Sequence, residues 1–253
     1  MKKILILLLE VLVLCIGVSA FAFAEDLGLE AGAEMGFGDV ADETVIRISP
    51  FVTYSKTIDP LEFYLKAQYT AAFEDPDTLH SLYLEPDIIY SFPVGLGSVA
   101  VELYGEDTFY IDPSDDMEGM IEPSIQYSQG FSFGELYAKF GLPITYEPDT
   151  ATDFYGTLGY DRSGFNLEFS TYYNMDPDTE IMGYELFLSY EQDLFYLELA
   201  IDTDKHIELF TLSPYGELYI DRFILWAGVD IGNLGDTDLD ETVSPYVGCS
   251  YTF

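Results

Sequence analysis

The segment "LEFYLKAQYTAAF" (residues 61–73) alternates along its whole length between two kinds of side chain. One set is apolar and comprises Leu61, Phe63, Leu65, Ala67, Tyr69, Ala71 and Phe73. The interleaved set is mostly polar and comprises Glu62, Tyr64, Lys66, Gln68 and Thr70. Successive side chains of a β-strand point to opposite faces, so the segment is predicted to be a strand with one apolar and one polar face.

The same alternation recurs along the chain and predicts an all-β fold of fourteen strands, with twelve as the alternative count. The predicted strands are 26–37, 45–55, 61–73, 81–91, 98–106, 120–128, 135–146, 153–161, 165–174, 182–191, 194–202, 207–219, 222–231 and 242–253. The alternation slips in 98–106 and 207–219, where a β-bulge would account for it. Further bulges are expected at the prolines that recur inside predicted strands, because proline removes a ladder donor: Pro50, Pro86, Pro123, Pro214 and Pro245.

The connections between these strands fall into two classes. Short turns such as "DRSG" (161–164) and "FPVGLG" (92–97) alternate with longer acidic loops such as "EDPDTLH" (74–80) and "DPSDDMEG" (112–119). Short turns at one rim and longer loops at the other are typical of an up-and-down barrel in an outer membrane.

Charge separates the two faces of the predicted strands. Acidic residues outnumber basic ones by 46 to 9 in the whole chain, and the apolar sets contain essentially none of either, with Glu208 at a loop junction as the borderline case. The acidity argues against binding of nucleic acid, whose phosphates need basic partners. The abundance of Tyr (21) and Phe (19) argues against a disordered acidic chain.

The strands of a soluble β-sandwich would show the same alternation of apolar and polar residues. The composition of the polar face therefore has to distinguish a sandwich from a membrane barrel. Here it mixes carboxylates with large aromatic side chains such as Tyr64, Tyr172 and Trp226. A confined, wet barrel interior explains that mixture better than an open solvated face.

The N-terminal sequence also supports an exported membrane barrel. Lys2 and Lys3, an apolar run and Ala22-Phe23-Ala24 predict a secretory signal over residues 1–24, which leaves 25–253 as the barrel. A membrane anchor helix, or a lipoprotein modified at Cys15, are the alternatives. No later segment reaches the about 18 uninterrupted apolar residues of a membrane helix, so an exported chain that spans a membrane would do so as a closed barrel.

With the signal, the alternating strands and the terminal Tyr251-x-Phe253, the sequence resembles bacterial outer-membrane β-barrel proteins of the porin-like type. The resemblance implies an outer-membrane location among its lipids. It also implies that Tyr251 and Phe253 are read by the barrel-assembly machinery and that the last strand pairs with the first.

These expectations lead to a functional hypothesis, a channel for passive diffusion of small cationic or neutral solutes, because carboxylate-lined pores favour cations. The acidic residues expected to line it are Glu62, Glu85, Asp87, Glu102, Glu122, Glu168, Glu185 and Glu198. The expected basic residues are Arg47, Lys66 and Lys139, and the expected aromatic residues are Tyr64, Tyr83, Tyr137, Tyr172 and Trp226. A girdle at the membrane interface is expected from Tyr54, Tyr90, Tyr127, Tyr160, Tyr190 and Tyr251.

Two other classes of function are weighed against the channel. An enzyme is not expected, because His80 and His206 stand outside any recognisable motif, and no cofactor or specific metal site is expected. The other class is a non-conducting structural or surface-binding barrel, whose Asp-Pro-Asp-Thr loop pieces (75–78 and 176–179) would hold divalent cations weakly.

Overall fold

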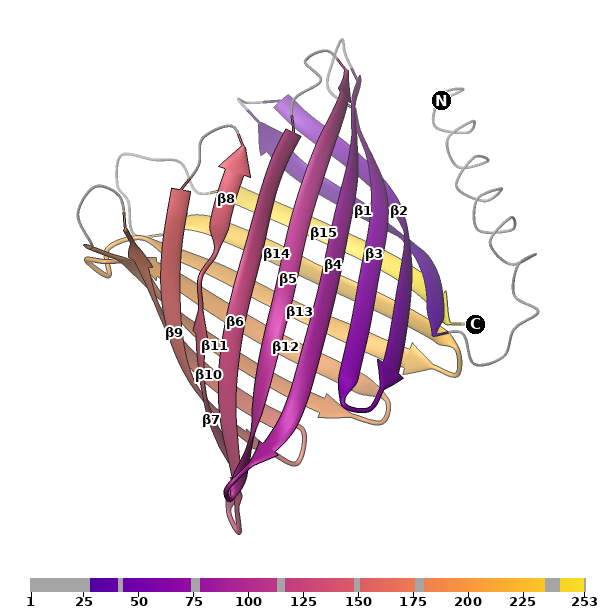
Figure 1. Ribbon diagram of the computed structural model, residues 1–253. Helices are drawn as coiled ribbons and strands as arrows, with labels where there is room; N and C mark the ends of the chain where they lie inside the picture. The colour runs from indigo at the N-terminus through magenta and orange to yellow at the C-terminus, as the bar shows by residue number, and fades with distance from the viewer. Residues whose placement is uncertain are drawn as a thin grey trace.

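A computed structural model describes residues 28–40, 43–73, 78–112, 117–147, 151–175, 180–234 and 242–252. These residues form one antiparallel sheet in which successive strands of the wall are hydrogen-bonded to each other (Figure 1). The elements are β1 (Leu29–Val40), β2 (Glu43–Ile58), β3 (Leu61–Phe73), β4 (Thr78–Val94), β5 (Gly97–Asp112), β6 (Met117–Phe131), β7 (Gly134–Gly141), β8 (Ile144–Glu147), β9 (Ala151–Arg162), β10 (Phe165–Asn174), β11 (Glu180–Gln192), β12 (Phe195–Asp204), β13 (Phe210–Ile220), β14 (Phe223–Leu234) and β15 (Thr242–Thr252).

The sheet closes on itself at the two ends of the chain. β15 pairs with β1 from Glu30 opposite Thr252 to Gly36 opposite Tyr246, while β1 also pairs with β2. Closure leaves no free sheet edge, which is how a barrel removes the exposed ladder of an edge strand. The predicted pairing of the last strand with the first is confirmed.

β7 and β8 together form one strand of the wall. Gly141 lies opposite Ser124 and Ile144 opposite Ile121, so the register against β6 is unchanged across the break. The interruption falls at Leu142 and Pro143, where the amide of Leu142 donates to the carbonyl of Pro123 at 3.0 Å. The predicted strand 135–146 is therefore interrupted in its ladder, and the barrel has the predicted 14 strands.

The prediction of bulges at the prolines is wrong. Register shifts occur near Ser81, Met120, Tyr173 and Leu212, and none occurs at the five prolines. Each proline keeps its register with one neighbour and interrupts the ladder toward the other: Pro50 faces Ala33, Pro86 faces Leu65, Pro123 faces Leu103, Pro214 faces Leu199 and Pro245 faces Val229. A missing N–H removes one hydrogen bond without adding a residue, so the ladder has a gap and no bulge.

The predicted short turns are present at one rim. Two-residue turns at 59–60, 95–96, 132–133, 163–164, 193–194 and 221–222 join the strands at one rim. Ser163 and Gly164 both have positive φ (52° and 84°), the conformation that matches the twist of a two-residue hairpin.

At the opposite rim the described connection is 205–209. The carboxylate of Asp204 accepts the backbone N–H groups of His206, Glu208 and Leu209 at 3.2, 2.8 and 3.0 Å. These bonds hold 206–209 in a loop. β13 therefore begins at Phe210, and the predicted start of this strand at residue 207 is wrong.

The apolar register of the strands is the outer surface of the barrel. Leu65, Leu103 and Leu158 are 45%, 49% and 68% exposed, whereas among the described apolar residues only Val45, Ala71 and Tyr155 are buried. One departure from the expected absence of charge is Asp107, which shares the outward register with Leu84 and accepts a hydrogen bond from Tyr146. The predicted strand 98–106 ended too early to include it. Lys56 and Arg162 also lie in the outward register, beside the short turns.

Candidate functional site: the inner wall of the barrel

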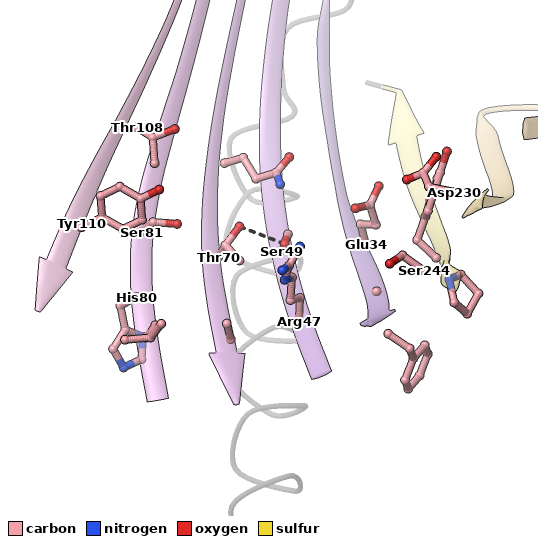
Figure 2. A pocket seen from close by; sticks show the side chains of 17 residues that line it. Glu34, Arg47, Ser49, Thr70, His80, Ser81, Thr108, Tyr110, Asp230 and Ser244 are labelled. Atoms are coloured by element: carbon pink, nitrogen blue, oxygen red, sulfur yellow. Dashed lines mark hydrogen bonds between the residues drawn. The ribbon is translucent and has the colours of Figure 1, made fainter. Parts of the chain in front are cut away.

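The inner face is identified by a hollow that side chains from seven strands share. Glu34 of β1, Ser49 of β2, Thr70 of β3 and Tyr246 of β15 all line one cavity of about 670 Å³. Figure 2 shows side chains of this cavity side by side on neighbouring strands. Strand pairing extends the same face around the barrel, because residues directly opposite each other point the same way.

This face carries the carboxylates singled out in the sequence. Glu62 and Glu85 lie on it in β3 and β4, opposite Ile89 and Lys66. The structure places the others on the same face: Asp87, Glu102, Glu122, Glu168, Glu185 and Glu198. Further carboxylates share it without having been singled out as site residues: Glu30, Glu34, Glu106, Glu217 and Asp230.

Aromatic side chains on the inner face lie across glycines to reach carboxylates two strands away. A Cβ at Gly159 would stand 2.0 Å from the Tyr137 ring, and Tyr137 donates across that glycine to Glu168. Gly141 likewise lies under Tyr155, which donates to Glu122. Because glycine has no side chain, the tyrosine ring can lie flat against the wall over it. The ring and the carboxylate that it contacts together cover this part of the wall.

A second pattern joins tyrosine and glutamate along one strand. Tyr83 donates to Glu85 at 3.0 Å, Tyr196 to Glu198 at 2.7 Å, and Tyr215 to Glu217 at 2.5 Å. Two residues apart on a strand means the same face. The hydroxyls thus satisfy one oxygen of each carboxylate while leaving its charge in place.

Three basic side chains share this face in the described part of the chain, and their environments differ. Lys139 forms an ion pair with Glu102 at 2.5 Å. Lys66 lies over the rings of Phe51 and Tyr83 at 5.7 and 5.8 Å. Arg47 stands opposite Gly36 and is solvent-exposed, with no carboxylate of the described residues at salt-bridge distance.

The seam between the first and last strands is covered by two aromatic side chains. Trp226 lies over Gly248 of β15, and Phe51 lies over Gly32 of β1. Their ring centroids are 5.7 Å apart, and Trp226 Nε1 donates to Glu34 at 3.4 Å. Side chains of β14 and β2 therefore meet above the closure.

The tyrosines proposed as a girdle all occupy the outward register beside the short turns. Tyr54, Tyr90 and Tyr127 are 36%, 46% and 40% exposed. Tyr160, Tyr190 and Tyr251 face Leu136, Leu197 and Ala31 in the same register. Phe253 and the predicted signal over residues 1–24 lie outside the described residues.

The remaining chemical candidates are sparse. His80 stacks on Tyr69, whose hydroxyl lies 2.6 Å from Nδ1, in the outward register. His206 lies in the 205–209 loop. The described residues contain no group of three or more His, Cys, Asp or Glu side chains placed to hold a metal ion. No described helix is long and apolar enough to cross a membrane.

Sequence reasoning missed the residues that make the hollow. Gly36, Ser49, Thr70 and Ala72 are small and lie on three neighbouring strands, opposite or beside Arg47. No short motif marks them. The signal that was available is the local lack of large side chains in the inner register of three neighbouring predicted strands.

Comparison with solved structures finds matches of low similarity. A variant of Rh. blastica porin matches with a TM-score of 0.46 and 10% identity, over 90% of this chain and 100% of that one. CdiB from Acinetobacter baumannii matches with a TM-score of 0.48 and 10% identity, over 89% of this chain and 60% of that one. No protein-family model and no curated protein sequence matches this chain. Similarity at this level says nothing about function, which has to be inferred from the wall residues.

Proposed function

We propose that the protein is an outer-membrane channel for passive diffusion of small solutes, with an acidic inner wall that favours cations. The observation that carries the proposal is the closed barrel with its apolar face outside and its carboxylates inside. An exposed apolar outer face of this extent is unfavourable in water and favourable in lipid, where a closed barrel satisfies its backbone groups.

The interior provides space as well as charge. Barrel diameter grows with strand number, and eight strands already enclose a core that side chains just fill. Every described residue lies in a wall strand or in a connection of a few residues, and none of these segments is long enough to act as a plug.

The charge balance of the wall supports a preference for cations. Three basic side chains stand against carboxylates on nearly every strand, and one of the three, Lys139, is neutralised by Glu102. Fixed negative charge in a confined pore attracts cations and repels anions.

The test is electrical. The barrel is refolded into a planar bilayer, and single-channel current is recorded in a salt gradient. We expect discrete current steps with a reversal potential of the sign that marks cation preference. A folded barrel that carries no current would contradict the channel and leave a structural or surface-binding barrel, with its loops as the working surface.

A further inference from the structure

The hollow in the inner wall is made by small side chains around one arginine. Arg47 stands between Gly36 on β1 and Ala72 on β3, directly opposite each. A Cβ at Gly36 would make ordinary van der Waals contact with the Cβ atoms of Tyr246 and Arg47, at 3.9 and 4.0 Å, so the hollow there depends on small side chains. The volume, about 670 Å³, is within the range of small-molecule sites.

Arg47 is unusual on this wall. Lys139 is paired with Glu102, and Lys66 lies over two rings, but the Arg47 guanidinium projects into the hollow without a carboxylate partner among the described residues. A guanidinium presents a planar set of donors that matches a carboxylate in a two-bond arrangement. The feature this side chain would recognise is therefore a small anionic group.

Carboxylates occupy one side of the hollow. Glu34 pairs with Ser49 and so lies diagonal to Arg47, about 7–8 Å away between backbones. Asp230 lies on β14, three strands from Arg47, which corresponds to about 14 Å at the usual spacing of strands. Figure 2 shows Glu34 and Asp230 on the same side of Arg47. Together they attract a cationic group and repel a free anion.

Hydroxyl groups occupy the other side. Ser49 and Thr70 are hydrogen-bonded to each other at 2.9 Å, and Ser81, Thr108 and Tyr110 continue the row on β4 and β5. Figure 2 shows Thr70, Ser81, Thr108 and Tyr110 on the side of Arg47 away from Glu34, and Ser49 on the same strand as Arg47. They can donate to or accept from an uncharged polar group.

We infer that this hollow is a subsite for small polar zwitterions of the amino-acid class, with Arg47 holding the carboxylate and Glu34 the ammonium group. A simple cation has no use for Arg47, a simple anion is repelled by Glu34 and Asp230, and a neutral solute needs neither charge. Only a solute with both charges matches the whole arrangement. The inference rests on the proposed channel and names its solute class.

The protein contains a reporter for the test. Trp226 is the single tryptophan of the chain, and its Nε1 donates to Glu34. The full chain is folded in detergent micelles and titrated at neutral pH with serine, with ethanolamine, which lacks the carboxylate, and with 3-hydroxypropionate, which lacks the amine. Serine is expected to give a saturable change in Trp226 fluorescence, and the other two to require at least tenfold higher concentrations. No saturable response to serine, or an equal response to ethanolamine, would overturn the inference.

Matched variants test the role of Arg47. Arg47→Gln is expected to raise the half-saturating serine concentration at least tenfold, whereas Lys66→Gln, which removes the same charge elsewhere on the wall, leaves it unchanged. Arg47→Lys keeps the charge without the planar fork and is expected to fall between them. Equal effects of the Arg47 and Lys66 changes would overturn the subsite. Serine binding without bilayer current would refute the channel and leave the subsite, and current without serine binding would do the reverse.

Discussion

Two regions of the inner wall share the same alternation and the same acidity but differ in what fills them. From β7 to β11, Tyr137 and Tyr172 reach Glu168 and Glu185, and their rings coat the wall. Around Arg47, by contrast, the inner positions of β1 to β3 include Gly36, Ser49, Thr70 and Ala72, and they border a hollow. Side-chain size in the inner register, more than charge, decides where a solute can stay close to the wall.

The largest effect on stability is expected from replacing a glycine that lies beneath a tyrosine ring. Gly159→Ala puts a Cβ into the Tyr137 ring, which must then leave Glu168. Overpacking of this kind costs about 1–3 kcal/mol in the free energy of unfolding. Equilibrium urea unfolding of the barrel in detergent or lipid measures it.

Gly156→Ala is the matched control for that change. Gly156 lies on the same strand, and a Cβ there meets nothing within 4 Å. We expect no loss of stability, because alanine replaces a residue that favours strands poorly. Equal losses at Gly156 and Gly159 would show that the ring does not depend on the glycine beneath it.

A second variant fills the hollow around Arg47 with a ring, as tyrosines fill the wall from β7 to β11. Thr70→Tyr places a large ring among Ser49, Ala72 and Ser81, where it occupies the space beside Arg47. We expect a lower single-channel conductance and loss of the serine response, with Thr70→Val, which keeps the shape but lacks the hydroxyl, retaining the conductance. Unchanged conductance and serine binding in the tyrosine variant would place the solute path elsewhere.

The smallest effect is expected at Lys139. The Lys139–Glu102 pair is largely screened from solvent, and Ser124 also donates to Glu102 at 2.7 Å. Lys139→Gln is therefore expected to cost about 0.5–1.5 kcal/mol of stability, the contribution of a typical hydrogen bond, because glutamine can still donate to Glu102. It should also shift the reversal potential slightly further toward cation preference. We expect Lys66→Gln, which breaks no ion pair among the described residues, to cost less stability than Lys139→Gln. A larger loss for Lys66→Gln would contradict this expectation.

The fold was predictable because strand alternation is local. Residues 61–73 could be assigned from their own sequence, and their boundaries agree with β3. Features that depend on contacts with other parts of the chain were not: Leu142, at the break, donates to Pro123 of the neighbouring strand, and β13 begins only after a loop held by hydrogen bonds to Asp204. Prolines kept their register because a missing donor adds no residue.

The inner register could likewise be read from the sequence, while the hollow within it could not. Gly36, Arg47 and Ala72 come together only through the pairing of three strands. In the sequence each is an ordinary member of its own strand. The same holds for the closure, where Phe51 and Trp226 meet across β1 and β15 although they are far apart in the chain.

The central claim is that carboxylates on the inner face govern which ions cross the barrel. It is tested most directly by the reversal potential in a potassium chloride gradient, measured for the protein and for a variant with Glu62, Glu85, Glu122, Glu168, Glu185 and Glu198 all changed to Gln. We predict cation preference in the unmodified barrel and a reversal potential shifted toward zero in the variant, whose β-sheet circular dichroism should match. The same cation preference in both barrels would contradict the account.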